Sequence, residues 1–238
     1  MKQTAIPCLL MRGGTSKGLF FLASDLPADV ATRDQVLLAA MGSPDKRQID
    51  GLGGAHPLTS KVGIISTSTR PGVDLEFLFA QLQPDKDTVD TTPNCGNMLA
   101  AVVPFALETG MVSAQGETST FRVLTLNTDM TSDITVQTPG GQVDYEGDAR
   151  IDGAPCSSAP ITINFLDTAG SVCSGLLPTG RVRDTVTVEG AGFASFALDV
   201  TCIDNGMPLV IFKATDLGRS GYESVAELNA DTALKAKI

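Results

Sequence analysis

The chain has 238 residues, of which 42% are hydrophobic and 18% charged, and its formal net charge is −10. This composition supports a folded core and excludes wholesale disorder, and the acidic balance argues against nucleic acid or an anionic membrane as the main partner. Five scattered cysteines without a C-x-x-C pair, and a start that lacks a signal-peptide pattern, predict free thiols and a cytoplasmic location. A single histidine argues against a histidine-based zinc site.

The first third of the chain alternates between predicted strands and one predicted helix. Period-two or β-branched apolar residues predict strands at 5–10, 19–23, 62–68 and 73–77. Residues 29–41 carry a rough apolar stripe that predicts a helix, and Gly42 is expected to stop it.

Three polar, glycine-rich segments interrupt these elements. The first, RGGTSKG at 12–18, could bind a carboxylate through Arg12, Thr15, Ser16 and its backbone amides, or it could be a solvated hairpin turn. The second, at 50–61, lacks the G-x-G-x-x-G pattern and brings Ser60 and Lys61 to the start of a strand. There Lys61 is either a general base or an ordinary surface lysine.

The third segment, TTPNCGN at 91–97, leads into an apolar stretch. Asn94 is expected to cap a helix over 97–109, with Cys95 and Gly96 in its first turn. Free amides there favour negative charge, and the alternative is a small buried thiol at a helix entry. Because the helix is apolar all round it should lie inside a core, with Pro104 as a kink or second start.

The rest of the chain is predicted to be mainly β-structure. Strands are expected at 121–124, 134–137, 143–146, 161–165, 185–188, 197–203 and 209–213, and a last helix at 224–238. A turn-rich stretch predicts a boundary that separates a domain 1–177 from a domain 178–238. Taken together, the elements predict an α+β fold in which a strongly curved sheet wraps a buried helix.

Five motifs in order, MRGGTSKG, QIDGLGGAHPLTSK, DTTPNCGNML, YEGDARIDGAP and CIDNGMP, resemble the PrpF family of cofactor-independent isomerases. Within the family the resemblance is closest to the 4-oxalomesaconate tautomerase branch, with aconitate and methylitaconate Δ-isomerases as sister activities. It implies a diaminopimelate-epimerase-like fold of two pseudo-symmetric domains, each a barrel-like sheet around a helix. Because family members continue past this length, the second domain is expected to be incomplete.

The resemblance also implies the site. Lys61 and Cys95 match catalytic positions, and a di- or tricarboxylate substrate is expected to bind without metal or cofactor. The residues expected to line its site are Arg12, Thr15, Ser16, Ser60, Asn94, Gly96 and Asn97, with Asn205, Met207 and Pro208 from the second domain. A homodimer is left open, and a non-catalytic polycarboxylate-binding fragment is the competing hypothesis.

Overall fold

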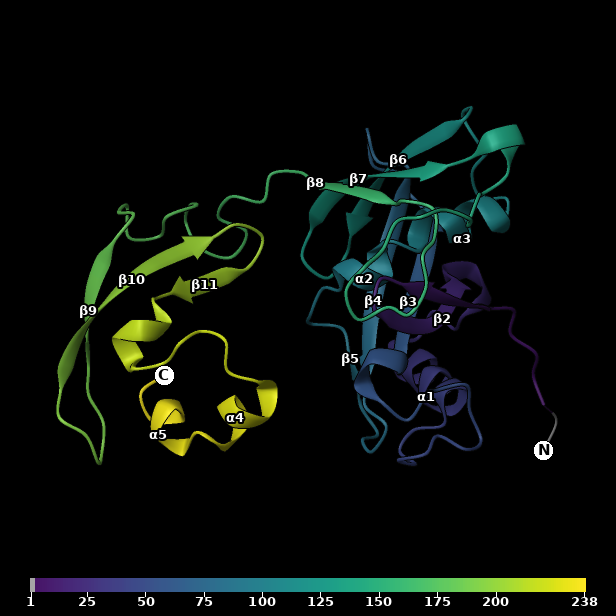
Figure 1. Cartoon of the computed structure of the whole chain (residues 1–238). Helices are drawn as coiled ribbons and strands as arrows, with labels where there is room; N and C mark the ends of the chain where they lie inside the picture. Colours follow the sequence, from purple (N-terminus) through teal and green to yellow (C-terminus); the bar gives the residue numbers. More distant parts are fainter. Residues whose placement is uncertain (1–2) are drawn as a thin grey trace. The chain divides into compact units, whose positions relative to one another are not determined.

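Strands dominate the structure of residues 3–238, a computed structural model (Figure 1). Contacts divide it into two units, one that ends at Leu166 and one that spans Asp167–Ile238. This division falls before the turn-rich stretch at 177–180, because the carboxylate of Asp204 holds the loop that precedes that stretch. Asp204 accepts hydrogen bonds of 2.7 Å from Ser171 Oγ and from the backbone N–H groups of Val172 and Cys173.

The first unit contains a mixed sheet that curls around two short helices. Its strands follow the order β1-β2-β3-β4-β6-β7-β8, and β5 pairs with β4. The β2–β3 and β4–β6 pairs are parallel and the others antiparallel. The strands are β1 Leu9–Gly13, β2 Ser16–Leu22, β3 Lys61–Thr67, β4 Leu75–Leu82, β5 Val89–Asp90, β6 Thr118–Thr125, β7 Met130–Gln137 and β8 Thr162–Phe165.

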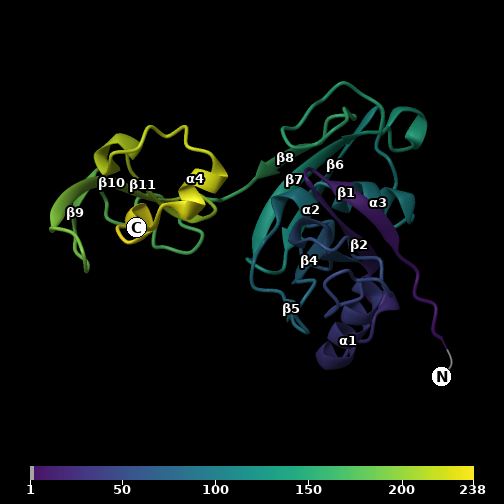
Figure 2. The same cartoon turned by 60° about the horizontal axis from the view of Figure 1, so that its bottom comes forward.

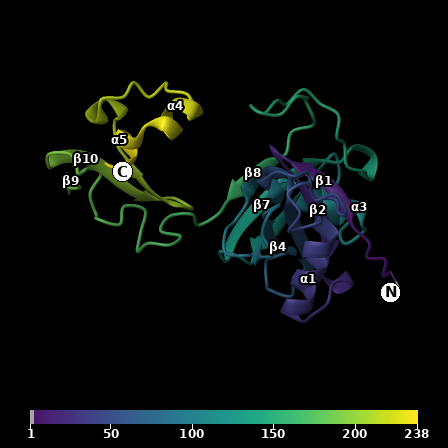
Figure 3. The same ribbon diagram turned by 90° about the horizontal axis from the view of Figure 1, so that it is seen from below.

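The central strands of this sheet are buried on both faces. On one face Phe20 packs with the side chains of α2 (Gly96–Leu99) and α3 (Val102–Glu108). On the other face the next residue, Phe21, packs with Leu37 and Met41 of α1 (Val30–Met41). Figure 2 shows α1 apart from α2 and α3 in the first unit, and Figure 3 shows α1 apart from α3. Adjacent strand residues point to opposite faces, so the continuous apolar run LFFL at 19–22 places side chains in both cores.

The first predicted helix is confirmed, and the second is divided. Asp29 caps α1 by accepting a hydrogen bond of 2.9 Å from Thr32 N, and Gly42 ends it with a left-handed φ of 79°. The apolar stretch at 97–109 is interrupted between α2 and α3 rather than continuous. Pro104 lies in the first turn of α3, where a missing N–H costs little, so the expected second start is confirmed.

Two strand predictions need correction. The expected strand at 5–10 is displaced to Leu9–Gly13, because the hairpin with β2 pairs Gly13 with Ser16 and turns at Gly14. Residues 143–146 form no strand, and instead begin a long loop that reaches β8, closed by a bridge between Ala149 and Ser158. The other predicted strands all overlap observed ones.

The second unit is a three-stranded antiparallel sheet with two short helices. Its strands are β9 Asp184–Val188, β10 Phe196–Asp204 and β11 Pro208–Ile211, with order β11-β10-β9. Leu198, Val200 and Leu217 form its small core. The 3₁₀ helices of the chain are η1 Ala23–Asp25, η2 Pro57–Thr59, η3 Pro139–Gly141 and η4 Ala214–Leu217.

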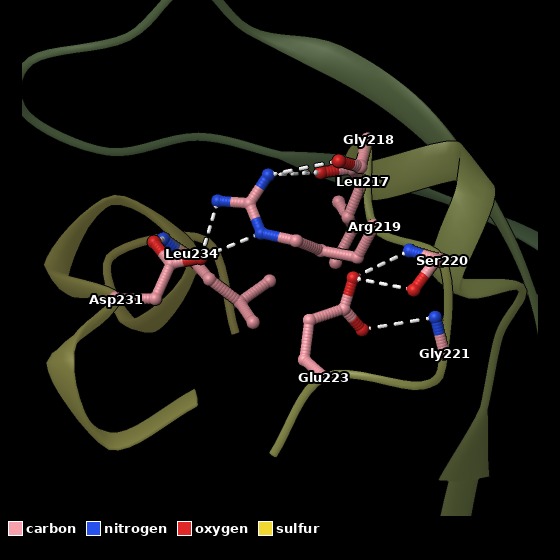
Figure 4. Close-up of polar contacts among 8 residues, drawn as sticks. All are labelled: Leu217, Gly218, Arg219, Ser220, Gly221, Glu223, Asp231 and Leu234. Atoms are coloured by element: carbon pink, nitrogen blue, oxygen red, sulfur yellow. Dashed lines mark hydrogen bonds and ion pairs between the residues drawn. The ribbon is translucent and has the colours of Figure 1, made fainter. Parts of the chain in front are cut away.

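The expected helix at 224–238 is wrong as a single element. It is divided into α4 (Val225–Ala230) and α5 (Thr232–Lys235), which ends before the last residue. Asp231, with a ψ of 81°, leaves the helical conformation, and its carboxylate caps α5 and pairs with Arg219 (Figure 4). The Asp231 backbone still donates to the Leu228 oxygen at 3.3 Å and accepts from the Lys235 N–H at 3.1 Å, so the side chain adds bonds at this break.

No helix of residues 3–238 is both long enough and apolar enough to cross a bilayer. In the same range, no three His, Cys, Asp or Glu side chains gather in a group that could hold a metal ion.

Candidate active site

The β1–β2 hairpin lies directly against the start of α2. A Cβ on Gly13 would come within 1.9 Å of the backbone oxygen of Asn97, and one on Gly14 within 2.2 Å of its Oδ1. Only glycine permits such an approach, and Gly14 also has a left-handed φ of 51°. Across this contact Asn97 Nδ2 donates to Thr15 Oγ1 at 3.0 Å and to Ser16 Oγ at 3.5 Å. The hairpin and the helix therefore bring together three polar residues that were expected to bind substrate.

Lys61 begins β3 in the middle of the sheet. Its backbone lies between Gly18 of β2 and Gln81 of β4, and the residue is only 7% exposed. Its Nζ lies 3.3 Å from the Sγ of Cys95 and 5.5 Å from the centroid of the Phe79 ring. It forms no ion pair with a carboxylate among residues 3–238. The interpretation of Lys61 as an ordinary surface lysine is therefore wrong, because the amine is buried against a thiol.

Cys95 is the N-cap residue of α2, which corrects the expectation that Asn94 would cap this helix. The Asn94 side chain instead accepts a hydrogen bond of 2.7 Å from the Cys95 N–H through Oδ1. Gly96 is the first residue of α2, and the helix has only four residues. The helix macrodipole is the sum of aligned peptide dipoles. The single turn of α2 therefore has a smaller macrodipole than the continuous helix expected at 97–109. Hydrogen-bonding side chains and the lysine therefore dominate the polarity here.

Ser60 lies next to Lys61 but its hydroxyl is bound inside the protein. Its Oγ is 2.8 Å from Gln48 Oε1 and 2.8 Å from the backbone oxygen of His56, and the residue is fully buried. His56 accepts a hydrogen bond of 3.1 Å from the Leu58 N–H through Nδ1, so this side chain helps to hold the loop. The loop before β3 thus holds Ser60 from within.

Gln48 organises this loop, and the sequence reasoning did not single it out. It is 1% exposed and has a left-handed φ of 50°. Its Oε1 accepts from Ala55 N at 2.9 Å and from Ser60, and its Nε2 donates to Ser43 Oγ at 3.2 Å. The only available signal was its place as the first letter of the motif QIDGLGGAHPLTSK.

Arg12 lies exposed beside a cavity of about 700 Å³, separate from the Lys61–Cys95 contact. The cavity lies between β1, the α2–α3 segment, β7 and the loop that precedes β8, and most of its wall is apolar. Gly96 and Asn97 line it, so it borders the polar cluster at the hairpin. At its rim Tyr145 donates a hydrogen bond of 3.0 Å to Glu108, and burial together with this bond raises the pKa of Tyr145.

The remaining expected site residues belong to the second unit. Asn205, Met207 and Pro208 lie at the β10–β11 turn, where Asp204 pairs with Pro208, and all three are exposed. The strands predicted at 197–203 and 209–213 therefore pair as an antiparallel hairpin. Asn205 Oδ1 accepts a hydrogen bond of 2.6 Å from Thr168 Oγ1 within the same unit.

Comparison with known proteins supports the reading of the motifs. Residues 3–238 match a family described as PrpF protein. The chain is 54% identical to a (4E)-oxalomesaconate Delta-isomerase of Novosphingobium sp. and to a 4-oxalomesaconate tautomerase of Pseudomonas putida. These matches cover 98% and 100% of this chain and 62% and 63% of the relatives, so the chain spans about three fifths of their length.

A solved structure shares the fold. The crystal structure of a methylitaconate-delta-isomerase matches 98% of this chain and 59% of that chain, with a TM-score of 0.84 and 40% identity. The curled mixed sheet and the small second sheet therefore correspond to an architecture already known.

Proposed function

This chain belongs to the PrpF family, and from that premise we propose that it is part of an isomerase that moves a proton across three carbons of an unsaturated polycarboxylate. The first substrate to test is 4-oxalomesaconate, because two relatives with 54% identity are named for it. The contact of 3.3 Å between Lys61 Nζ and Cys95 Sγ carries the proposal. It supplies two proton-carrying groups at one place.

In the proposed reaction the amine of Lys61 removes a proton from a carbon next to the double bond. The electron pair of that C–H bond forms a new C=C bond, and the old one shifts its electrons toward a carbonyl or carboxylate. The ammonium group of Lys61, or the thiol of Cys95, then returns a proton to the far carbon. One proton leaves and one arrives, so the shift C=C–C–H to H–C–C=C needs no external oxidant or reductant.

The polar cluster beside this pair suits the rest of the substrate. The Asn97 amide and the Thr15 and Ser16 hydroxyls offer donors to carboxylate oxygens, and Arg12 adds a cation at the hairpin. Donors fixed in place stabilise the negative charge that develops when the proton leaves. We assign substrate binding in the first unit to these four residues, together with Asn94 and Gly96 beside Cys95.

In the proposed architecture the first unit carries the chemistry and the second is part of a related epimerase-like domain. The family pattern assigns Asn205, Met207 and Pro208 of the β10–β11 turn to substrate binding, and this assignment stays a prediction. Cys95 and Lys61 both come from the first unit, so the proton-transfer pair does not depend on the second.

The test is to add 4-oxalomesaconate to this chain and follow its keto–enol interconversion by absorbance. Lys61→Ala should lose nearly all turnover, whereas Lys17→Ala, which removes a hairpin lysine outside the pair, should stay close to wild type. Equal rates for Lys61→Ala and wild type would exclude Lys61 as the base. Binding of tricarballylate without turnover would instead favour a polycarboxylate-binding fragment.

A Δ-isomerase acting on methylitaconate or aconitate is the second candidate, favoured by the structural match to a methylitaconate-delta-isomerase. The two candidates differ in which C–H bond exchanges with solvent. Proton NMR in D₂O with 4-oxalomesaconate, methylitaconate and aconitate decides between them, since deuterium enters only the substrate that is turned over.

A further inference from the structure

We propose that the Lys61–Cys95 contact is also a site of reversible oxidative modification, at which peroxide couples the two side chains through a covalent sulfur–nitrogen bond. This inference rests on the geometry of the pair and not on the proposed isomerase activity. Nothing in the proton shift requires it.

The two reacting atoms are already adjacent. Nζ lies 3.3 Å from Sγ, and the lysine side chain is held against the Phe79 ring with only 7% of the residue exposed. Within the described residues, Lys61 forms no ion pair with a carboxylate. The polar neighbour of its buried amine is the Cys95 thiol. Lysine has several rotatable side-chain bonds through which Nζ can approach Sγ further.

Cys95 lies at the edge of the core, next to exposed residues from which a small oxidant can approach it. Cys95 is half-buried, and the neighbouring Gly96 and Asn97 are exposed. A thiol beside a lysine lies in the electropositive surroundings typical of oxidation-sensitive cysteines. All five cysteines are free thiols, so Cys95 has no disulfide partner in the described structure.

The chemistry balances with hydrogen peroxide as the oxidant. In the first step the thiol and peroxide give a sulfenic acid and water, and the sulfur loses two electrons to the peroxide oxygen. In the second step Nζ attacks Sγ, an S–N bond forms, the S–O bond breaks, and the hydroxide leaves as water with an amine proton. This is the side-chain counterpart of the sulfenamide that a backbone nitrogen forms.

The product is protected in two ways. Formation of the S–N bond consumes the sulfenic acid before further peroxide can oxidise it irreversibly to sulfinic acid. A thiol reductant reverses it by attacking the sulfur, which releases the amine and leaves a mixed disulfide that a second thiol reduces.

The experiment exposes this chain to hydrogen peroxide, digests it with trypsin without reductant and analyses the peptides by mass spectrometry. We expect a peptide pair joined between Lys61 and Cys95, lighter by two hydrogen atoms than the two peptides together. Dithiothreitol should remove the link and restore both peptides.

Two variants make the result decisive. In Lys61→Arg a long basic side chain is kept but the guanidinium is a poor nucleophile, so Cys95 should advance to sulfinic acid without a link. In Lys17→Arg, a matched change on the hairpin, the link should form as in wild type. A wild-type protein that gives only sulfinic acid, or a link that persists in Lys61→Arg, overturns the proposal. These masses are independent of turnover, so failure here leaves the proposed isomerase untouched, and the reverse also holds.

Discussion

The Nζ atom of Lys61 lies 3.3 Å from the Sγ atom of Cys95, although 34 positions separate the two residues in the sequence. The first residue of β3 and the N-cap residue of α2 meet because α2 and α3 pack into the concave face of the curled sheet. One buried contact thus joins the glycine-rich loop before β3 to the loop before α2. Three changes test how the structure maintains and uses this arrangement, and a fourth tests the turn before α4 in the second unit.

Removing the Cys95 thiol should slow the proposed isomerisation without unfolding the protein. Cys95→Ala deletes the group in contact with Lys61, and we expect kcat to fall about 100-fold, the lower range for loss of a proton carrier. Cys95→Ser keeps a hydroxyl near Nζ, so its kcat should lie between those of wild type and Cys95→Ala. Steady-state kinetics with 4-oxalomesaconate provides the measurement, and thermal unfolding checks the fold. Unchanged kcat in both variants would remove Cys95 from the mechanism.

Replacing Gly14 with alanine should disrupt the contact between the hairpin and α2. The new Cβ would lie 2.2 Å from Asn97 Oδ1, in addition to the roughly 1–2 kcal/mol cost of a left-handed φ. Gly72→Ala is the matched control, because Gly72 also has a positive φ, of 74°, but has no atom within 4 Å of its added Cβ. Urea unfolding should show a larger loss of stability for Gly14→Ala. Equal losses would mean that Asn97 moves aside freely.

Replacing Gln48 with leucine should loosen the loop that leads to Lys61. The change leaves the buried Ser60 hydroxyl without Oε1 as acceptor and Ala55 N–H without its partner, at a cost of about 1–3 kcal/mol. Ser43→Ala is the control, because it removes the contact to Nε2 and the bond from the Ser43 hydroxyl to the Gln83 oxygen but leaves Oε1 bound to Ser60 and Ala55. The free energy of unfolding should fall more for Gln48→Leu. A larger loss of unfolding free energy in Ser43→Ala than in Gln48→Leu would mean that Ser43, not Gln48, is the main support of the loop.

The turn before α4 should loosen at low pH through Glu223. Hydrogen bonds to its carboxylate, above all from the Ser220 N–H, lower its pKa from 4.5 to about 2 (Figure 4). Because the folded-state pKa is the lower one, these bonds stabilise the turn fully above about pH 4.5 and are lost as pH falls toward 2. NMR titration of Glu223 and exchange of the Ser220 and Gly221 amides provide the measurement. Glu223→Gln cannot ionise and should abolish the pH dependence of amide exchange. If the pH dependence persists in this variant, another titrating group causes it.

Several elements were predictable because their signals are local. Asp29 and Gly42 mark the ends of α1 through their own backbone and side-chain bonds, and they need no distant partner. Alternating apolar residues likewise predicted β6 and β7, where one side of each strand is buried.

Other elements depend on partners far along the chain. β1 is shifted toward Gly13 by its pairing with β2, and the apolar stretch at 97–109 divides because its two parts pack as separate short helices in the sheet. Asp231 interrupts the last helix by pairing with Arg219, a partner outside that segment. Propensity is a weak guide wherever such packing and side-chain bonds compete with it.

For the site, the sequence by itself determined the types of residue and the family pattern: a lysine, a cysteine, and hydroxyl and amide donors in glycine-rich loops. Only the tertiary structure decided that Lys61 faces Cys95, that Asn97 binds Thr15 and that Ser60 is held from within by Gln48. The physical reason is distance along the chain. A cap or turn involves neighbouring residues, whereas the partners in these contacts lie 12, 34 and 82 positions apart and meet only in the folded chain.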